Sequence, residues 1–231
     1  VLSGRKLKAC APASVSAGPW LPDPMEPEPR VYVVDDDLMV LRAIDRLLRS
    51  SGFAVQTFNS PKAFLGRLPY DGPACLVVDL RMPELSGLDV QDRIALESIP
   101  MPIVFFSGAS DVAATARAMR RGALDFLVKP VDDTTLVETV TRALKVAVEN
   151  WRRRLELAEI GRRLARLTKR ERQVCDLVAQ GLLNKQIASA LGASEKTVKV
   201  HRGRVMNKLE VDSVASLVWL LSRVSAPRSS P

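Results

Sequence analysis

The sequence predicts an α/β domain, built as a doubly wound five-stranded parallel (βα)5 sheet, followed by an all-α domain of four helices that contains a helix-turn-helix. Three observations lead to this prediction. Short apolar runs alternate with amphipathic stretches over the first two thirds of the chain, only helical patterns follow them, and the charge changes sharply between the two parts. With 231 residues and a hydrophobic fraction of 47%, the chain is long enough to form two cores.

The net charge of +8 is unevenly distributed along the chain. Residues 1–149 contain 17 Lys and Arg against 19 Asp and Glu, whereas residues 150–231 contain 17 against 7, so the first part carries −2 and the second +10. A nearly neutral part joined to a basic one indicates one domain that receives a signal and one that binds a polyanion. The alternative is a basic surface that only keeps the second domain solvated.

Composition excludes several kinds of site. The cysteines Cys10, Cys75 and Cys175 are odd in number, far apart and outside any CxxC pattern, so we expect neither a disulfide scaffold nor a zinc site. The single histidine, His201, excludes a site that needs two imidazoles. No apolar run approaches the roughly 18 residues of a membrane span, so we expect a cytoplasmic protein without a membrane segment.

Residues 1–29 form an extension rich in Pro, Ala and Ser without hydrophobic periodicity, which predicts disorder. Met25 stands shortly before the first predicted strand, and one hypothesis is that translation starts there. An intact mass of the natural protein that includes residues 1–24 would contradict this hypothesis.

Residues 30–149 alternate apolar, β-rich runs with helical patterns, which predicts the doubly wound parallel sheet. The third and fourth runs are apolar at consecutive positions, as strands buried on both faces require. The predicted strands comprise residues 31–34, 53–58, 75–80, 102–106 and 125–128. The predicted helices comprise residues 38–51, 60–68, 86–97, 111–121 and 133–149.

A basic amphipathic stretch follows at residues 150–166. Its apolar residues share one helical stripe, which predicts a linker helix that continues the last helix of the first domain. A short coiled-coil seam between two chains is the alternative, although Gly161 weakens it. The stripe consists of Trp151, Leu155, Ile160, Leu164 and Leu167.

The last part of the chain, residues 167–231, has the pattern of four short helices. Gly181 is expected to end the first, and Gly192 provides the turn between the second and third, which together form a helix-turn-helix. The predicted helices comprise residues 169–180, 185–191, 195–209 and a fourth that ends at Val224. The expected N-terminal caps are Thr168 with Glu171 in a capping box, Asn184, Ser194, and either Asp212 or Ser213.

Carboxylates gather at one edge of the predicted sheet, beyond the carboxyl ends of the strands, where open parallel sheets bind their ligands. The polar residues at these ends are Asp35, Asp36 and Asp37 after the first strand, Asp79 at the third, Ser107 at the fourth and Lys129 at the fifth. Clustered carboxylates repel one another unless a cation neutralises them, and their hard oxygen atoms suit Mg²⁺. A carboxylate screened by Mg²⁺ and Lys129 can also attack a phosphoryl group, whose oxygens Ser107 and Lys129 would hold.

At these residues the chain resembles the receiver domain of two-component response regulators. The matching segments are VVDDD at 33–37, VVDLRMPELSG at 77–87, FFSGAS at 105–110 and DFLVKP at 125–130. Their order and spacing extend the resemblance over residues 30–149. The resemblance implies that a partner histidine kinase phosphorylates Asp79.

The resemblance also implies the roles of the neighbouring residues. The implied Mg²⁺ ligands are Asp36, Asp79, the main-chain carbonyl of Arg81 and, through water, Asp35. The implied phosphoryl-binding and switch residues are Ser107, Lys129 and Phe126. The peptide bond between Lys129 and Pro130 is typically cis in this family.

Three residues near this edge also have other interpretations. Asp37 is expected to cap the first helix rather than to bind metal. Phe126 can instead be an ordinary core residue. Arg81 follows Asp79 by two residues, and its long cationic side chain can shield an acyl phosphate from water, so we predict that Arg81→Asn changes the rate of dephosphorylation.

The helix predicted at 195–209 carries an outward cationic stripe. The residues expected to pack inward are Val198, Val205 and Leu209, and those expected to face outward are Lys196, Lys199, Val200, Gly203 and Asn207. A cationic stripe with a small residue at its centre suits a helix in the major groove of DNA, where Gly203 permits close approach. Arg202, Arg204 and Lys208 flank the stripe and can reach phosphates.

Residues 167–222 resemble the LuxR-type helix-turn-helix, through LTKRERQVCDLVAQG at 167–181, NKQIASALGAS at 184–194 and TVKVHRGRVMNKL at 197–209. With the receiver, this makes the chain similar to the FixJ/NarL class of response regulators. By position, Lys199 and Val200 are implied to contact base edges, whereas Gly203 departs from relatives that often carry a polar or basic residue there. The implied DNA-binding residues are Lys196, Thr197, Lys199, Val200, His201, Arg202, Arg204 and Lys208; for His201, packing is the alternative.

The predicted function is a phosphorylation-dependent transcription regulator that is not an enzyme, although its receiver takes part in phosphoryl transfer and can dephosphorylate itself slowly. The implied partners are a histidine kinase, double-stranded promoter DNA, a second copy on phosphorylation and RNA polymerase. A phosphatase with an aspartyl nucleophile is one alternative, but it would need a second Asp where Arg81 stands. A constitutive DNA-binding protein with a vestigial receiver is the other, and the intact set of site residues argues against it.

Overall fold

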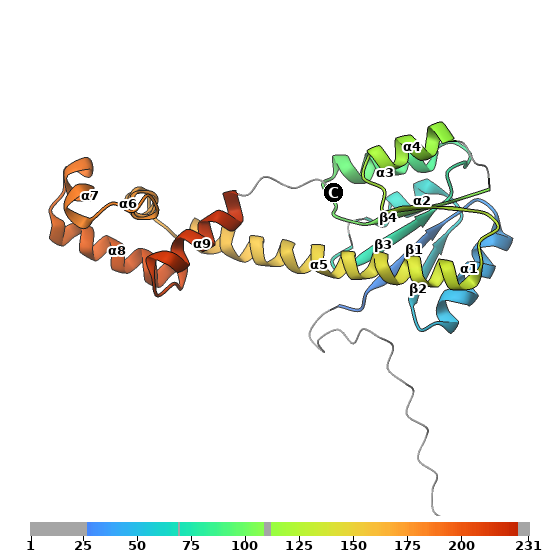
Figure 1. Cartoon of the computed structure of the whole chain (residues 1–231), viewed down its shortest axis with the longest axis horizontal. Coiled ribbons are helices and arrows are strands. Elements are labelled where there is room, and N and C mark those ends of the chain that lie inside the picture. Colours follow the sequence, from blue (N-terminus) through green and yellow to red (C-terminus); the bar gives the residue numbers. More distant parts are fainter. Residues whose placement is uncertain (1–26, 69, 109–111, 226–231) are drawn as a thin grey trace, which may run out of the picture.

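The computed structural model describes residues 27–68, 70–108 and 112–225. Most of the predicted N-terminal extension, residues 1–26, lies outside the described residues. Figure 1 shows a sheet with helices on both sides, a smaller group of helices, and one long helix that joins the two. No helix among the described residues combines the length and the apolar character needed to cross a membrane.

The sheet has five parallel strands in the order β2-β1-β3-β4-β5, which confirms the predicted α/β class. Its strands are β1 (Arg30–Val34), β2 (Ala54–Phe58), β3 (Ala74–Val78), β4 (Ile103–Ser107) and β5 (Asp125–Val128). Every residue of β3 and β4 is buried, as their continuous apolar sequence predicted. β3 is the middle strand, so whatever follows it stands at the centre of the carboxyl edge of the sheet.

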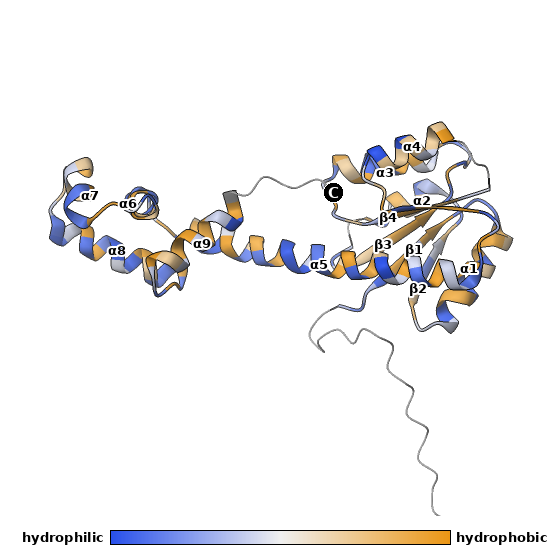
Figure 2. Ribbon diagram, viewed as in Figure 1, coloured by the Kyte–Doolittle hydropathy of each residue, from blue (hydrophilic) through white to orange (hydrophobic). Residues whose placement is uncertain are grey.

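Helices cover both faces of the sheet. The helices of this domain are α1 (Leu38–Ser50), α2 (Pro61–Leu65), α3 (Gly87–Leu96), α4 (Val112–Arg120) and the first half of α5 (Asp133–Ala165). One core, which includes Val31 and Val33, contains the apolar faces of α1 and α5. The other, which includes Tyr32 and Val34, contains those of α2, α3 and α4. Alternate residues of β1 thus enter opposite cores, and Figure 2 shows the sheet as the most continuously apolar part of the molecule.

Most boundaries in this domain lie within one residue of the predicted ones, but α2 and β3 end earlier than expected. The second helix was expected at 60–68 but ends at Leu65, because Gly66 and the residues after it form tighter bonds, such as Arg67 N–H to Phe64 C=O. The third strand was expected to reach residue 80 but ends at Val78. Asp79 still donates its N–H to Val34 C=O, so the carboxylate stands just past the end of the strand.

The second domain contains four helices around one core, as predicted. They are α6 (Lys169–Ala179), α7 (Asn184–Leu191), α8 (Glu195–Leu209) and α9 (Val214–Ser225). The fully buried residues at its centre include Val174, Ile187, Leu209 and Leu217. α7 and α8 pack together as the two helices of the helix-turn-helix, with Gly192 in a left-handed conformation between them.

Of the helix caps predicted in the second domain, three are present and one is wrong. Thr168 and Glu171 form the capping box of α6, Ser194 accepts the N–H of Thr197, and Ser213 accepts that of Ser216. Asn184 was predicted to cap the second helix but is instead its first residue. Leu183 precedes it, and the Leu183 N–H is bound by Gln186 Oε1.

α5 is a single helix of 33 residues, about 50 Å long at 1.5 Å per residue. The receiver helix expected at 133–149 and the linker helix expected at 150–166 are therefore continuous. Trp151 is buried against the first domain, and Ile160 and Leu164 belong to the core of the second. Of the predicted seam, Leu155 alone is exposed, at 44%, so most of that stripe is used within the chain.

Candidate functional site

The structure brings an ammonium group between two of the predicted carboxylates. Lys129, which follows β5, places its Nζ 2.6 Å from Oδ2 of Asp35 and 2.9 Å from Oδ1 of Asp79. Asp35 and Asp79 follow β1 and β3, and both are nearly buried. Ser107, the last residue of β4, is 1% exposed at the same edge of the sheet. Four strands thus each contribute one polar side chain to one place.

Burial and pairing set the charges at this edge. Burial raises the pKa of Asp35, against the hydrogen bonds from Lys129 and from the Asp37 N–H that favour its ionised form. For Lys129, burial alone would lower the pKa, but the hydrogen bonds to Asp35 and Asp79 outweigh it, so the pKa is raised. The lysine is therefore held as a cation between two carboxylates.

Backbone groups orient the two buried carboxylates. Arg81 N–H donates to Oδ2 of Asp79 at 2.6 Å, and Asp37 N–H donates to Oδ1 of Asp35 at 2.9 Å. Each carboxylate thus has one oxygen on a backbone N–H and the other on Lys129. Gly87 packs so closely here that a Cβ would stand 2.4 Å from the Asp79 carbonyl oxygen. Any side chain at residue 87 would displace the turn that carries Asp79.

The other two aspartates of the first motif have different positions. Asp37 caps α1 by accepting the N–H of Met39 at 2.8 Å, as expected. Asp36 is exposed. Among the described residues, no three His, Cys, Asp or Glu side chains converge as a metal cluster. Asp35, Asp36 and Asp79 still supply hard oxygen atoms at one sheet edge, which is the donor chemistry that Mg²⁺ prefers.

Two aromatic contacts lie near this edge of the sheet. Phe126 is half-buried and stacks on Phe105, with ring centroids 6.0 Å apart and planes 21° apart. The Phe106 ring lies 4.9 Å from Lys129 Nζ, a cation–π contact. The peptide bond between Lys129 and Pro130 is cis, as the resemblance predicted. Sequence reasoning named Phe126 as a switch residue and did not name Phe106, whose only signal was its place beside Ser107.

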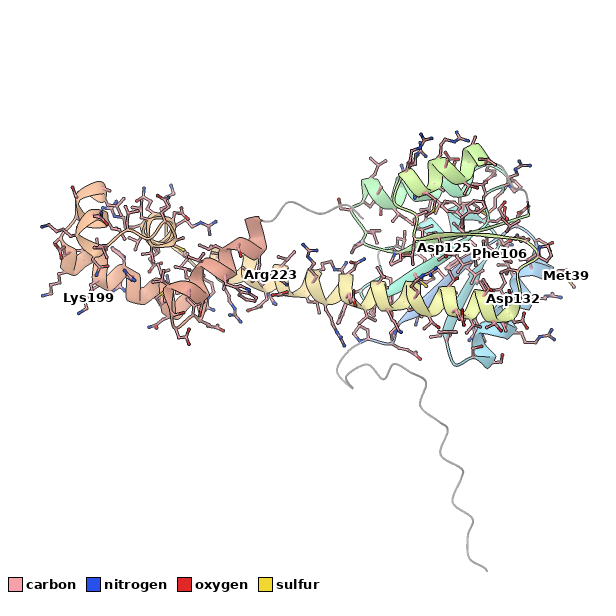
Figure 3. All side chains as sticks on the ribbon, viewed as in Figure 1. Met39, Phe106, Asp125, Asp132, Lys199 and Arg223 are labelled. Carbon is pink, nitrogen blue, oxygen red and sulfur yellow. The ribbon has the colours of Figure 1, made fainter. Side chains whose placement is uncertain are left out.

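The second candidate site is the outward face of α8. Val198, Val205 and Leu209 are buried, as predicted. The exposed residues of the helix include Lys196, Thr197, Lys199, Val200, Gly203, Arg204 and Asn207. Figure 3 shows Lys199 at the end of the molecule far from Phe106 and the carboxylate edge. A row of cations is thus presented to solvent at one tip of the molecule.

Three other predicted DNA-binding residues are partly buried in the domain. Arg202 donates to Oδ1 of Asn184 at 3.1 Å, which links α8 to the start of α7. Lys208 Nζ lies 2.6 Å from the buried carboxylate of Glu171 and 3.1 Å from the Arg166 carbonyl oxygen. His201 has a buried Nδ1 without a hydrogen-bond partner in the described part of the chain.

Lys208 also binds the carboxylate of the α6 capping box, a role that the sequence analysis did not assign to it. The Glu171 carboxylate accepts both the Thr168 N–H, at 2.9 Å, and the Lys208 ammonium. The hydrogen bond from Lys208 is the main cause that lowers the pKa of Glu171 to about 2. The sequence predicted the cap, but the lysine lies 37 residues further along the chain and gave no local signal.

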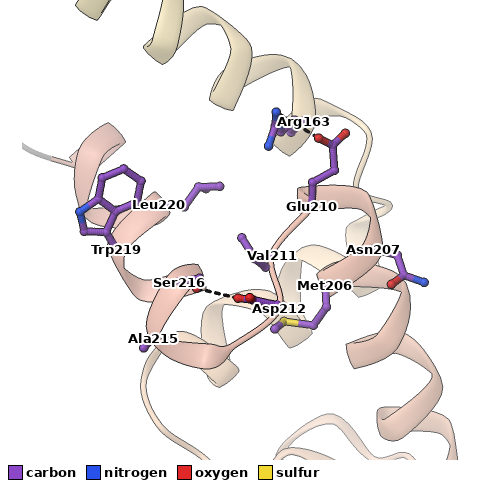
Figure 4. Close-up of a pocket in the computed structure, with 10 residues that line it drawn as sticks. All are labelled: Arg163, Met206, Asn207, Glu210, Val211, Asp212, Ala215, Ser216, Trp219 and Leu220. Carbon is purple, nitrogen blue, oxygen red and sulfur yellow. Dashed lines mark hydrogen bonds and ion pairs between the residues drawn. The ribbon is translucent and has the colours of Figure 1, made fainter.

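A cleft on the second domain adjoins the end of α8, where Asn207 lines it. The end of α5, the end of α8 and the first half of α9 line it, as Figure 4 shows. Arg163 on α5 forms an ion pair with Glu210 at 3.1 Å on one wall, and the largely exposed Trp219 lies on the other. None of the predicted DNA-binding residues lines it.

Known proteins resemble the chain in both parts. Residues 31–141 match the family model described as "Response regulator receiver domain", and residues 165–221 match "Bacterial regulatory proteins, luxR family". The response regulator protein TmoT of Ectopseudomonas mendocina is 42% identical over 194 residues, which cover 84% of this chain and 88% of that one.

Two further proteins extend this similarity. The transcriptional regulatory protein FixJ of Azorhizobium caulinodans is 40% identical over 189 residues, covering 81% of this chain and 89% of that one. The solved structure of the response regulator StyR has a TM-score of 0.76 and 41% identity, covering 85% of this chain and all of that one.

Proposed function

Because the chain belongs to the response regulators that join a receiver domain to a LuxR-type DNA-binding domain, and so is a transcription regulator rather than an enzyme, we propose that a phosphoryl group on Asp79 controls its binding to promoter DNA. The proposed domains are a receiver at 30–149, a linker at 150–166 and a DNA-binding domain at 167–231. Promoter binding places its action in the cytoplasm.

One observation supports Asp79 above the other aspartates. It follows β3, the middle strand, so it has Asp35 from β1 on one side and Ser107 and Lys129 from β4 and β5 on the other. Asp35 follows β1, which is one strand further from β4 and β5, and it is more deeply buried than Asp79. A phosphoryl group on Asp79 would therefore meet both the hydroxyl and the ammonium group.

The transfer is a displacement at phosphorus. An oxygen of the Asp79 carboxylate forms the new bond to phosphorus, the bond to the phosphohistidine nitrogen of the kinase breaks, and the imidazole leaves with that electron pair. The Lys129 ammonium passes from the carboxylate oxygen to a phosphoryl oxygen, and the Ser107 hydroxyl donates to another. Both groups are already in place at the edge of the sheet, so little reorganisation is required.

A magnesium ion completes the charge balance in this proposal. Its ligands would be Asp36, Asp79, the main-chain carbonyl of Arg81 and, through water, Asp35. When bound, it neutralises charge on the phosphoryl group. Lys129 alone cannot balance two buried carboxylates and a phosphoryl dianion, which is the electrostatic reason for the ion.

Phosphorylation would change the surface formed by α4 and β5. Ser107 moves toward the phosphoryl group and Phe126 turns inward from its half-buried position. This surface carries the exposed apolar side chains Val112, Met119 and Val128. A second copy of the chain would cover them, so phosphorylation promotes a homodimer.

The dimer would present two α8 helices to paired half-sites on DNA. Lys199 and Val200 contact base edges, and Lys196, Thr197 and Arg204 contact the backbone. The internal bonds of Arg202 and Lys208 favour a role in supporting the helix for these two residues, and His201 is proposed to act with them. RNA polymerase is a further partner of the DNA-bound form.

The experiment compares wild type with Asp79→Asn, each with Mg²⁺ and acetyl phosphate. Light scattering measures the oligomeric state, and fluorescence anisotropy measures affinity for DNA selected from a random pool. We expect only the wild type to dimerise and to bind more tightly on phosphorylation. If neither responds while both bind DNA equally, the receiver is vestigial and the proposal is wrong.

Arg81 gives a second test at the same site. Its side chain is exposed, two residues after Asp79. Arg81→Asn should therefore change the half-life of the acyl phosphate relative to the wild type in the same buffer. Arg153→Asn, which removes an exposed arginine from the middle of α5, serves as the control. Loss of radiolabelled phosphate measures the rate, and equal half-lives for wild type and Arg81→Asn contradict the prediction.

A further inference from the structure

The centre of the outward face of α8 has no hydrogen-bonding side chain. Val200 is 48% exposed there, and Gly203 follows it by three residues, about one turn along the helix. Exposed polar and cationic residues surround this pair, with Lys196 and Lys199 before it and Arg204 after it. A valine side chain and bare backbone therefore stand at the middle of a cationic surface.

Neither packing nor backbone conformation requires glycine at residue 203. A Cβ built there would meet nothing within 4 Å. Gly203 lies inside a regular helix, and it is not among the glycines with a positive φ. Because glycine weakens a helix interior relative to alanine, the residue has a cost without a structural reason. Its consequence is that the helix backbone can approach another molecule more closely at this point.

The major groove of DNA offers one apolar group to such a surface. Each base pair presents hydrogen-bond donors and acceptors in the groove, and thymine alone adds a methyl group. The backbone N–H and C=O groups around Gly203 are already bonded within the helix. The centre of the face can therefore discriminate bases by apolar contact and shape, whereas the lysines around it supply charge.

We propose that Val200 and Gly203 together read the 5-methyl group of a thymine in each half-site. This inference rests on the proposed function and names the base that the site recognises. The methyl group packs against the Val200 side chain, in the space that a Cβ at residue 203 would otherwise occupy. Gly203 is thus a specificity-determining residue, because its lack of a side chain leaves room for the methyl group.

The first experiment removes the methyl group from the DNA. A duplex selected from a random pool by the protein with Mg²⁺ and acetyl phosphate is remade with each thymine in turn replaced by deoxyuridine. At one or two positions in each half-site we expect binding to weaken about fourfold, the change in an equilibrium constant that burial of one methyl group gives at 25 °C. In Val200→Ala, the same replacement should have a smaller effect.

The second experiment adds a methyl group to the protein. Gly161 in α5 is a matched control, because it also lies in a helix and a Cβ there would also meet nothing within 4 Å. Both Gly203→Ala and Gly161→Ala should raise the melting temperature. Only Gly203→Ala should weaken binding to the selected duplex, by several fold, and it should bind the deoxyuridine duplex nearly as well as the thymine one.

The outcomes separate the two proposals. If the protein selects a duplex but tolerates deoxyuridine at every position, or if Gly203→Ala binds that duplex as wild type does, the thymine inference is wrong and the proposed function stands. If the wild type selects no duplex from the pool under any phosphorylation state, the proposed function itself is wrong, and the inference with it.

Discussion

Two lysines, one in each domain, each hold a carboxylate that is nearly buried. Lys129 bridges Asp35 and Asp79 in the receiver, and Lys208 binds Glu171 in the DNA-binding domain. The two arrangements differ in their other contacts. In the proposed mechanism Lys129 exchanges its carboxylate for a phosphoryl oxygen, whereas Glu171 is also bound to the Thr168 N–H and anchors the start of α6 to α8. Under the proposed function the first lysine serves signalling, whereas the contacts of the second join two helices of one core.

The Glu171 carboxylate should make the DNA-binding domain sensitive to acid. Its pKa is lowered from 4.5 to about 2, first through the hydrogen bond from Lys208. Because the folded-state pKa is the lower one, this contribution to the free energy of unfolding is fully present above about pH 4.5 and is lost as pH falls toward about 2. Glu171→Gln should be less stable than wild type at pH 7, with the difference shrinking in acid.

Thermal unfolding followed by circular dichroism between pH 2 and pH 7 measures this difference. Glu195→Gln, which removes an exposed carboxylate from the same domain, is the control and should follow the wild type closely. A difference between wild type and Glu171→Gln that stays constant over the whole range would show that the ion pair with Lys208 contributes nothing.

At the scale of elements, α3 holds one end of α4. Gln91 on α3 is buried, and its Nε2 donates to the carbonyl oxygens of Ala118 and Arg121, each at 3.2 Å. Arg121 also pairs with Asp92 at 3.0 Å on the surface. Both contacts lie at the C-terminal end of α4, whereas its N-terminal end follows the strand that carries Ser107. Any rearrangement of α4 should therefore pivot about its C-terminal end.

Gln91→Leu should destabilise the receiver by about 1–3 kcal/mol, the cost of leaving a buried carbonyl without its donor. Asp92→Asn, which only weakens an exposed ion pair, should cost less than about 1 kcal/mol. Urea unfolding of the two variants and the wild type measures both effects. Equal stability of Gln91→Leu and wild type would show that the amide does not hold α4.

The sequence predicted the elements better than the contacts between them. Hydrophobic periodicity located every strand and helix, and four caps followed from local residue types. The error at Asn184 arose because the helix begins one residue earlier than predicted, so Asn184 lies inside it and its side-chain oxygen accepts from Arg202. The N–H of the capping residue, Leu183, is bound by Gln186. In the site, the converging strand ends were predictable from parallel topology.

What the sequence did not reveal are contacts between residues far apart in the chain. The ring of Phe106 beside Lys129, the pairing of Lys208 with Glu171 and the amide of Gln91 under α4 each depend on how two elements pack. No periodicity or motif encodes such a pair, because each partner has an ordinary local role of its own. Only the assembled fold brings the partners together.

At the scale of the whole molecule, the two domains depend on one helix for their relative placement. The buried side chains of α5 that pack on the receiver end at Trp151, and those that enter the second core begin at Ile160. Beyond Trp151, Arg154 still forms an ion pair with Asp71 of the receiver at 3.2 Å. Between Trp151 and Ile160, residues 152–155 are exposed. Arg223 on α9 pairs with Glu156 near the end of this gap, so α9 also braces the helix on the side of the second domain.

Ala158→Pro should break this helix without unfolding either domain. Proline removes one helical hydrogen bond and costs about 3 kcal/mol in a helix interior, while the cores on either side keep their packing. Small-angle X-ray scattering should show a wider range of domain separations than in the wild type and in the Ala158→Ser control. Unchanged scattering would show that contacts outside α5 fix the arrangement.

A continuous α5 also fixes the rotation of the second domain relative to the receiver about the helix axis. A helix turns by about 100° per residue. The orientation of α8 relative to the receiver therefore depends on the number of residues in α5. One residue inserted after Leu157 would rotate the outward face of α8 by that angle. Seven inserted residues would return it to within about 20° of its original orientation. In a dimer of two receivers, the number of residues in α5 would then decide whether the outward faces of the two α8 helices meet the same side of a duplex or opposite sides.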